Sequence, residues 1–291
     1  MRDALVFGGS GQIGSAVLAR LQASGWRVLA VSRHAHADKN SDADTAIRWV
    51  SGELDAPPAL PDRFDAIVSC GPLDAFARWY PRAGIDAARV IAFGSTSVDT
   101  KQASEDPYER DLSARLAHAE QVLFARAAEC GAGLTVLRPT LVYGVGRDAN
   151  LTRIAGLARR WKRFPLPRGA TGLRQPVHVD DLAAAAMGCL DVAATHGRAY
   201  AVPGGETLPY CEMVARVLAC LQPPTKLLLL PQPVFALALH LARACGRAGG
   251  LGDAAIARMR EDLVFDVMPA QRDFGYLPRP FAPVAAMFRP A

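Results

Sequence analysis

The sequence lacks a hydrophobic segment long enough to cross a membrane. The apolar run LLLLPQPVFALALHL (227–241) contains no acidic or basic residue, but Pro231 and Pro233 interrupt it and Arg243 follows it closely. A transmembrane helix needs about 20 consecutive apolar residues. We therefore expect no membrane span, and we expect a helix beginning near Pro233 that packs in a core or between subunits. The first residues also lack the charged and apolar regions of a signal peptide, which predicts a cytoplasmic protein.

The sequence also lacks the residue patterns of metal sites and nucleic-acid readers. None of the six cysteines forms a CxxC pair or has histidines at metal-ligand spacing, which predicts buried, reduced thiols and no metal. Zinc-finger spacing and interleaved aromatic and basic residues are absent, so we expect no nucleic-acid partner. The formal net charge is +5 and arginines gather over 158–168. That basic run is either a solvated helix face or an attraction for an anionic ligand.

Short apolar runs alternate with helical patterns through the first half of the chain. The runs cover 3–8, 26–32, 65–70, 88–95 and 134–139, and near-continuous apolar runs are typical of parallel strands buried on both faces. The alternation predicts an α/β fold, a Rossmann-type doubly wound parallel sheet. We expect a dinucleotide-binding domain over 1–139, completed by about 177–203. A small, mostly helical substrate lobe over 140–291 would be interleaved with it.

The strongest motif is VFGGSGQIGSAVLARL, in which three glycines follow a predicted strand and open a predicted helix. Glycine permits the tight turn and lets the backbone approach a pyrophosphate, whose charge the free amides of the helix N-terminus attract. A glycine-rich structural turn is the alternative. The candidate cofactor contacts in this loop are Gly8, Ser10, Gly11, Gln12, Ile13 and Gly14.

The end of the second predicted strand bears on the choice of cofactor. NAD-binding proteins often place an acid there, whereas this chain has Ser32 and Arg33. A guanidinium can pair with a 2′-phosphate that an acid would repel, which favours NADP over NAD unless Arg33 is an ordinary surface residue. Further predicted cofactor contacts follow later strands: Glu53 and Leu54, then Cys70, Gly71 and Pro72.

Several segments together resemble the extended short-chain dehydrogenase/reductase superfamily, in its NAD(P)-dependent epimerase/dehydratase-like branch. They are GGSGQIG, FGSTSV (93–98), AEQVL (119–123), LRPTLVYGVG (137–146), RQPVHVDDLA (174–183) and FGYLPRPF (274–281). The resemblance implies a Rossmann domain with a substrate lobe, cofactor contacts at Ser95 and Pro139, a small-molecule substrate, and a homodimer.

The resemblance also implies a catalytic Ser/Thr, a Tyr, and a Lys four residues after the Tyr. Thr96 aligns with the Ser/Thr, but counting back from Ala119–Glu120 places Leu112 and Leu116 where the Tyr and Lys belong. Leucine can neither donate a proton nor carry a charge. Tyr108, one turn earlier, is the candidate replacement for the proton donor.

Two interpretations of function stay open. Leu141 occupies the place of an asparagine that contacts the diphosphate in many sugar-nucleotide members, which argues against a standard sugar nucleotide. The chain is either an oxidoreductase or epimerase-like enzyme with an atypical site, acting on a sugar derivative or another small carbonyl compound, or a non-catalytic dinucleotide-binding sensor or scaffold. The candidate substrate contacts are Tyr143, Arg147 and Arg174. The acids at 180–181 and the neighbouring His178 are expected to be structural.

Overall fold

The computed structural model describes residues 1–33, 46–244 and 253–289, and the chain forms two compact units. Unit 1 contains residues 1–140, 179–202 and 266–278, whereas unit 2 contains residues 141–178, 203–265 and 279–291. The chain therefore leaves unit 1 after residue 140 and returns to it twice.

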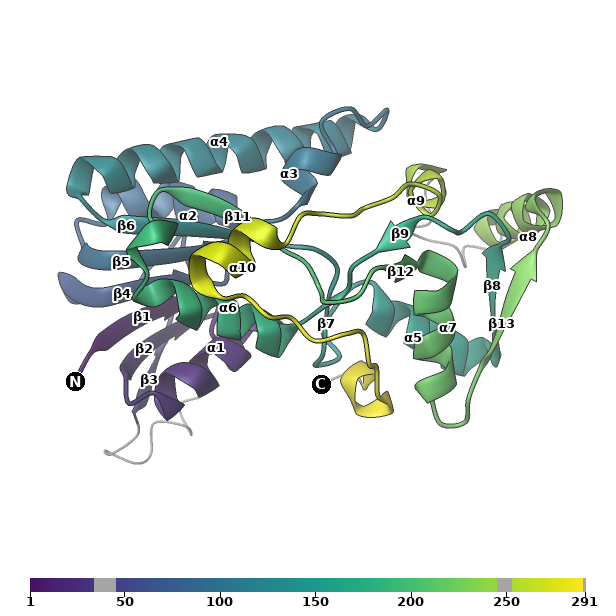
Figure 1. Cartoon of the computed structure of the whole chain (residues 1–291), viewed down its shortest axis with the longest axis horizontal. Coiled ribbons are helices and arrows are strands. Elements are labelled where there is room, and N and C mark those ends of the chain that lie inside the picture. The colour runs from purple at the N-terminus through teal and green to yellow at the C-terminus, as the bar shows by residue number, and fades with distance from the viewer. Residues whose placement is uncertain (34–45, 245–252, 290–291) are drawn as a thin grey trace. The chain divides into compact units, whose positions relative to one another are not determined.

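Unit 1 is built on a seven-stranded parallel sheet with the strand order β11-β6-β5-β4-β1-β2-β3 (Figure 1). The strands are almost wholly buried at its centre, as in β5 and β6, because helices cover both faces. The predicted Rossmann-type doubly wound sheet is confirmed. The strand bounds are β1 Asp3–Phe7, β2 Arg27–Ser32, β3 Ile47–Ser51, β4 Arg63–Ser69, β5 Asp86–Phe93, β6 Gly133–Pro139 and β11 Arg198–Val202.

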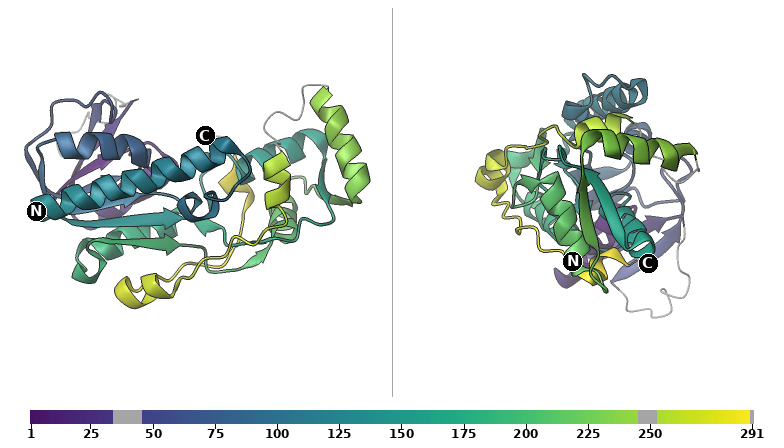
Figure 2. Two further views of the ribbon diagram at one scale, coloured as in Figure 1. Left: turned by 90° about the horizontal axis from the view of Figure 1, so that it is seen from above. Right: turned by 90° about the vertical axis from the view of Figure 1, so that its right-hand side faces the viewer.

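Helices pack on both faces of this sheet. The helices α2 (Leu73–Trp79) and α4 (Pro107–Cys130) contact each other on one face, and α1 (Gln12–Ala23) and α6 (Val179–Leu190) contact each other on the opposite face. Figure 1 shows these two layers, and the left view of Figure 2 shows how far α4 extends. The short helices α3 (Ser97–Thr100) and α10 (Met268–Phe274) complete the unit together with the 3₁₀ turns η2 (Tyr80–Arg82) and η3 (Ala193–Thr195).

Local chemistry determines both ends of α4. The side chain of Asp106 accepts a hydrogen bond from the backbone N–H of Tyr108, and Pro107 occupies the first turn. Both are favoured at a helix N-terminus. The helix ends at Gly131, whose φ of 71° is the left-handed conformation that glycine adopts without strain. This helix carries the positions where the family's tyrosine and lysine were expected.

A buried arginine joins the sheet to α6. Arg89 on β5 donates hydrogen bonds to the carbonyl of Leu190 at 2.9 Å and to the hydroxyl of Thr195 at 3.1 Å. It also donates to Thr135 on β6 at 3.3 Å. Burial lowers the pKa of Arg89, so these neutral acceptors are what hold its charge in the interior.

Unit 2 combines helices with three two-stranded sheets. Its core gathers side chains from its helices and from β8, with Leu151, Met213 and Phe288 fully buried. The parallel pairs are β7 (Val142–Tyr143) with β10 (Val177–His178) and β8 (Arg163–Pro167) with β13 (Lys226–Leu230), and the antiparallel pair is β9 (Leu173–Arg174) with β12 (Leu208–Pro209). The helices are α5 Leu151–Trp161, α7 Tyr210–Cys220, α8 Gln232–Ala244, α9 Asp253–Arg258 and the 3₁₀ turn η4 Ala285–Phe288.

The apolar run over 227–241 divides into two elements. Leu227–Leu230 belong to β13, which was not predicted, and α8 begins at Gln232, close to the predicted Pro233. The sequence predicted packing in a core or between subunits. Only one side of α8 is buried, and packing between subunits stays a prediction. Phe235 is buried, but Val234 and Leu237 on α8 are 49% and 62% exposed. The right view of Figure 2 shows α8 crossing the β8–β13 pair. Over the described ranges, no helix has both the length and the apolar character that a bilayer crossing demands.

Candidate functional site

The glycine loop between β1 and α1 is packed so closely that its glycines cannot be replaced without displacing backbone. Gly8 has a φ of +72°, and a Cβ there would lie 2.9 Å from the carbonyl carbon of Cys70. A Cβ on Gly14 would lie 2.1 Å from the carbonyl oxygen of Gly8. The loop therefore brings the start of α1 directly against the end of β1, which is the arrangement predicted from the motif.

The N-terminus of α1 has no side chain capping it. Gly11 is the N-cap residue and the first turn contains no acid. The N–H of Gly11 donates to the carbonyl of Gly8 at 2.9 Å, and that of Ser15 donates to the carbonyl of Gly11 at 3.0 Å. The intervening first-turn amides of Gln12, Ile13 and Gly14 have no intrahelical acceptor, so they and the helix dipole favour an anion there.

A serine pair connects this loop to the end of β2. The hydroxyl oxygens of Ser10 and Ser32 are 2.7 Å apart. Ser32 is buried and Arg33, the next residue, is exposed. The structure thus places Ser32 beside the loop, and contact of Ser32 and Arg33 with a 2′-phosphate stays a prediction.

The predicted contacts after β3 and β4 lie along the same edge of the sheet. Cys70 follows β4 and its backbone packs against Gly8, while a Cβ on Gly71 would lie 3.2 Å from the side chain of Leu54. Pro72 is the N-cap of α2. Glu53 is exposed and is held in a turn by backbone hydrogen bonds exchanged with Ala56. Burial of the Cys70 thiol raises its pKa to about 12, so this thiol stays protonated near neutral pH.

Thr96 follows β5 and is buried. Its hydroxyl donates to the carbonyl of Pro139 at 3.2 Å, and its N–H contacts the same oxygen at 3.2 Å. The hydroxyl of Ser95 accepts a hydrogen bond from the N–H of Ser97 at 3.1 Å. The predicted site residues Ser95, Thr96 and Pro139 are therefore adjacent.

Leu112 and Leu116 both pack into the core of unit 1. Leu116 is 9% exposed within the hydrophobic cluster, and Leu112 packs against that cluster from a partly buried position. Between them, Ser113 donates to the carbonyl of Val98 at 2.7 Å and joins α4 to α3. Tyr108 lies in the first turn of α4 and is 70% exposed. Its role as a proton donor stays a prediction.

An ion pair on the same helix was not predicted. Glu120 on α4 is buried and accepts two hydrogen bonds from Arg138 on β6, one of them at 2.8 Å. Arg138 also reaches Asp99 on α3 at 3.2 Å. The bond to Glu120 raises the pKa of Arg138. This ion pair holds α4 and α3 against β6 next to Thr96, and the sequence signal for it was the acid in the family's alanine–glutamate pair.

The three predicted substrate contacts of unit 2 differ in their surroundings. Tyr143 is 1% exposed, and its ring packs edge-on against His178 and Phe281 at centroid distances of 5.2 and 5.0 Å. Arg147 is exposed. Arg174 is buried and lines a cavity of about 350 Å³. Substrate contact by these residues stays a prediction.

Residues 4–80 match the NAD dependent epimerase/dehydratase family. A 2-alkyl-3-oxoalkanoate reductase of Stenotrophomonas maltophilia is 27% identical over 94% of each chain. A UDP-glucose 4-epimerase of Vibrio cholerae is 28% identical over 62% of this chain and 51% of its own. A UDP-glucuronic acid 4-epimerase of Bacillus cereus, solved with UDP-glucuronic acid and NAD, has the same fold, with a TM-score of 0.69 and 13% identity over 96% and 95% of the two chains.

The chain is therefore similar to the NAD dependent epimerase/dehydratase family over residues 4–80, and it shares the fold of the Bacillus cereus epimerase. Two buried polar atoms beside the glycine loop support a dinucleotide there. Gln12 Oε1 and Ser69 Oγ have no hydrogen-bond partner within the part of the chain that the structure describes. Ser69 is paired in register with Phe7, the residue before Gly8. Buried polar atoms normally find partners, so the residues present fit a bound dinucleotide.

Proposed function

We propose that this protein is a cytoplasmic, NADP(H)-dependent oxidoreductase that acts on a small carbonyl compound. The observation that carries the proposal is the 2.7 Å contact between Ser10 in the glycine loop and Ser32, the residue before Arg33. The relative that matches over 94% of both chains is named as a reductase, which supports a redox reaction. The free cysteines Cys70, Cys130, Cys189, Cys211 and Cys220 are compatible with a reducing compartment.

Arg33 would determine the preference for NADP. Its guanidinium is exposed directly after β2, where it can form charge-assisted hydrogen bonds with a 2′-phosphate. The Bacillus cereus epimerase was solved with NAD, so a preference for NADP would distinguish this chain from that protein.

Titration of the purified protein with NADPH and NADH tests this assignment. Hydrogen bonds to a charged group contribute about 1.5–3 kcal/mol, so we expect NADPH to bind roughly 10- to 100-fold more tightly than NADH. Arg33→Ala should remove most of that difference. The matched control is Arg20→Ala, which removes an equal charge about 12 Å along α1 and should leave the preference intact. Equal wild-type affinities would contradict the NADP assignment.

The chain's own residues limit the chemistry that follows binding. When bound, the coenzyme supplies or accepts a hydride. The Thr96 hydroxyl would hold the substrate carbonyl, and donation to it requires that the hydroxyl rotate away from the Pro139 carbonyl it now contacts at 3.2 Å. Water, Tyr108 or Tyr143 would supply the proton. Missing acid–base help costs on the order of 10² to 10⁴ in rate, so we expect slow turnover or an activated substrate.

A non-catalytic dinucleotide-binding protein is the second candidate function. The observation that favours it is the packing of Leu112 and Leu116 in the core of unit 1, where an acid–base pair would be desolvated. NADPH oxidation with aldehydes, ketones and 3-oxo acids separates the candidates. Turnover that Thr96→Val abolishes would support the oxidoreductase. Turnover that is absent in the wild type and gained in Leu112→Tyr/Leu116→Lys would support the non-catalytic protein.

A further inference from the structure

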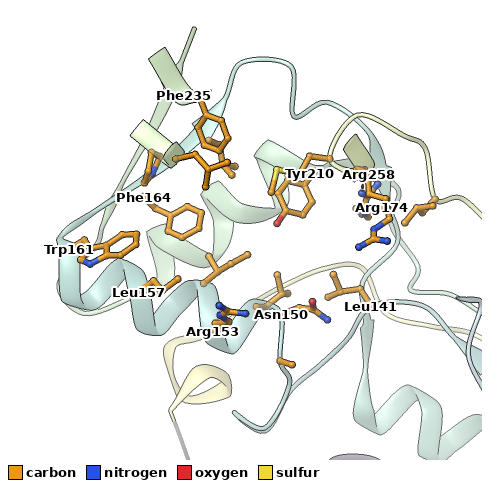
Figure 3. A pocket seen from close by; sticks show the side chains of 18 of the residues that line it. Leu141, Asn150, Arg153, Leu157, Trp161, Phe164, Arg174, Tyr210, Phe235 and Arg258 are labelled. Atoms are coloured by element: carbon orange, nitrogen blue, oxygen red, sulfur yellow. Dashed lines mark hydrogen bonds between the residues drawn. The ribbon is translucent and has the colours of Figure 1, made fainter. Parts of the chain in front are cut away.

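Unit 2 contains a cavity bounded by α5, α7, α8, β8 and the segment around Met259 (Figure 3). Its volume of about 350 Å³ lies within the range of small-molecule sites, about 300–1,000 Å³. Every residue that lines it belongs to unit 2, so the site is complete within one unit.

The lining is strongly apolar at one end. Of the nineteen described residues that line the cavity, fourteen are apolar. Figure 3 shows the aromatic rings of Trp161, Phe164 and Phe235 together at this end. Phe235 comes from α8, whose Ala238 and Leu239 also line the wall. Such a wall offers van der Waals contact and almost no hydrogen bonds, which is the environment that favours a hydrocarbon chain.

The other end of the cavity is cationic. Arg174 and Arg258 lie next to each other there, and Arg153 and the Tyr210 hydroxyl face the space between the two ends (Figure 3). No acid occurs among the described lining residues. Unit 2 as a whole carries sixteen Lys and Arg against six Asp and Glu, a formal net charge of +10, while unit 1 carries −5. The field at this end therefore favours an anion.

Arg174 supplies a fixed positive charge in the wall. It is 6% exposed, and its guanidinium donates to the carbonyls of Leu173, Glu261 and Arg258 at 2.7, 2.7 and 2.5 Å. The Tyr210 ring lies 5.4 Å from it. The acceptors are neutral, and burial lowers the pKa of Arg174. An anion at this end of the cavity would offset that desolvation.

We propose that this cavity binds the alkyl chain of a carboxylate, with its hydrocarbon at the aromatic end and its carboxylate at the arginine end. The substrate class is then a small carbonyl compound that carries both an alkyl chain and a carboxylate. This inference rests on the proposed oxidoreductase function and specifies its substrate. A nucleoside diphosphate sugar fits less well, because its hydroxyls and base edges would lie unpaired against fourteen apolar residues.

Calorimetric titration of the full chain, saturated with NADP⁺, tests the proposal with straight-chain carboxylates of increasing length and with the matching alcohols. Each buried methylene contributes about 0.8 kcal/mol, so Kd should tighten about fourfold per methylene until the cavity is filled. A carboxylate should bind at least about tenfold more tightly than its alcohol, because only the carboxylate can form a charge-assisted hydrogen bond with the arginines.

Two pairs of variants test which end of the cavity holds the alkyl chain and which end holds the carboxylate. Ala238→Phe adds bulk to the cavity wall and should abolish the dependence on chain length. Ala236→Phe, on the exposed part of the same helix, should preserve it. Arg153→Gln should weaken carboxylates about tenfold without changing alcohols, whereas Arg160→Gln, exposed on the same helix, should change neither.

The outcomes separate this proposal from the one on which it rests. If the wild type binds NADPH but shows neither chain-length dependence nor preference for carboxylates, the cavity proposal is wrong and the oxidoreductase proposal stands. The same holds if a UDP-sugar binds and alkyl carboxylates do not displace it. Chain-length dependence without any NADPH binding would sustain the cavity and overturn the oxidoreductase. Identical behaviour of the two variants in either pair would also overturn the assignment of the ends.

Discussion

Replacing Gly14 by alanine adds only one methyl group, but it should distort the dinucleotide site and weaken binding there. The added Cβ would lie 2.1 Å from the Gly8 carbonyl oxygen and 2.8 Å from the carbonyl carbon of Gly8 and the Cα of Gly9. Real Cβ contacts essentially never fall below 3.0 Å. The distance between the Gly14 Cβ and the Gly8 carbonyl oxygen must therefore increase by nearly 1 Å. The three atoms that the new Cβ would overlap all belong to the backbone, so no side-chain rotation can relieve the overlap.

The cost of this change can be worked out from two opposing terms. Alanine in a helix is favoured over glycine by about 0.5–1 kcal/mol, whereas overpacking costs about 1–3 kcal/mol. We expect a net loss of about 1–2 kcal/mol in the free energy of unfolding, or roughly 2–8 °C in Tm. Moving the loop should also remove at least one amide contact to the pyrophosphate, which weakens NADPH binding about 10- to 100-fold.

Gly156→Ala is the matched control. Gly156 lies inside α5 and an added Cβ meets nothing within 4 Å, so this variant should gain about 0.5–1 kcal/mol and bind NADPH as the wild type does. Thermal unfolding and NADPH fluorescence titration measure both effects. If Gly14→Ala melts no lower than the wild type and keeps its Kd, the close packing of loop and helix is not what shapes the site.

Three further predictions concern charged side chains of unit 1. Arg89→Met should lower the free energy of unfolding in urea by about 3 kcal/mol or more, because several buried acceptors lose a charged donor. Glu120→Ala should cost about 2–3 kcal/mol in the same assay by leaving the half-buried Arg138 without its main carboxylate; an unchanged midpoint would contradict that. Hydrogen bonding, chiefly from Arg272, lowers the pKa of Asp273 from 3.8 to about 2, so its stabilisation is complete above pH 3.8 and lost as the pH falls through 2. The Tm difference between the wild type and Asp273→Asn should therefore be present at neutral pH and vanish near pH 2.

The parallel sheet and the glycine loop could be predicted because their signals are local. Each central strand is a short apolar run, and a buried parallel strand needs no more than that. The loop is a strand, three glycines and a helix in immediate succession, so chain order alone brings Gly8 against Gly14. Cys70 also lies beside Gly8, because the carboxyl ends of neighbouring parallel strands meet at one edge, and its contact with a cofactor stays a prediction.

Unit 2 could not be predicted in the same way, because its contacts join distant segments. Residues 142–143 pair with 177–178, and 173–174 pair with 208–209, and two-residue strands leave no periodic pattern. Leu227–Leu230 illustrate a second limit, since a short apolar run can be strand or helix until its partner is known. Here Pro231 ends the strand before α8 begins. The cavity is formed only when helices far apart in the chain pack together, so no sequence motif predicted it.

The discontinuity of unit 1 constrains how the protein can be made. β6 has β5 on one side and β11 on the other, but β11 is translated about sixty residues after β6 ends. During that interval on the ribosome, an apolar strand edge is open to pairing with other chains. A gene fragment that stops at residue 140 should therefore yield aggregates, and separate expression of the two units would require circular permutation or splicing of the three segments of unit 1.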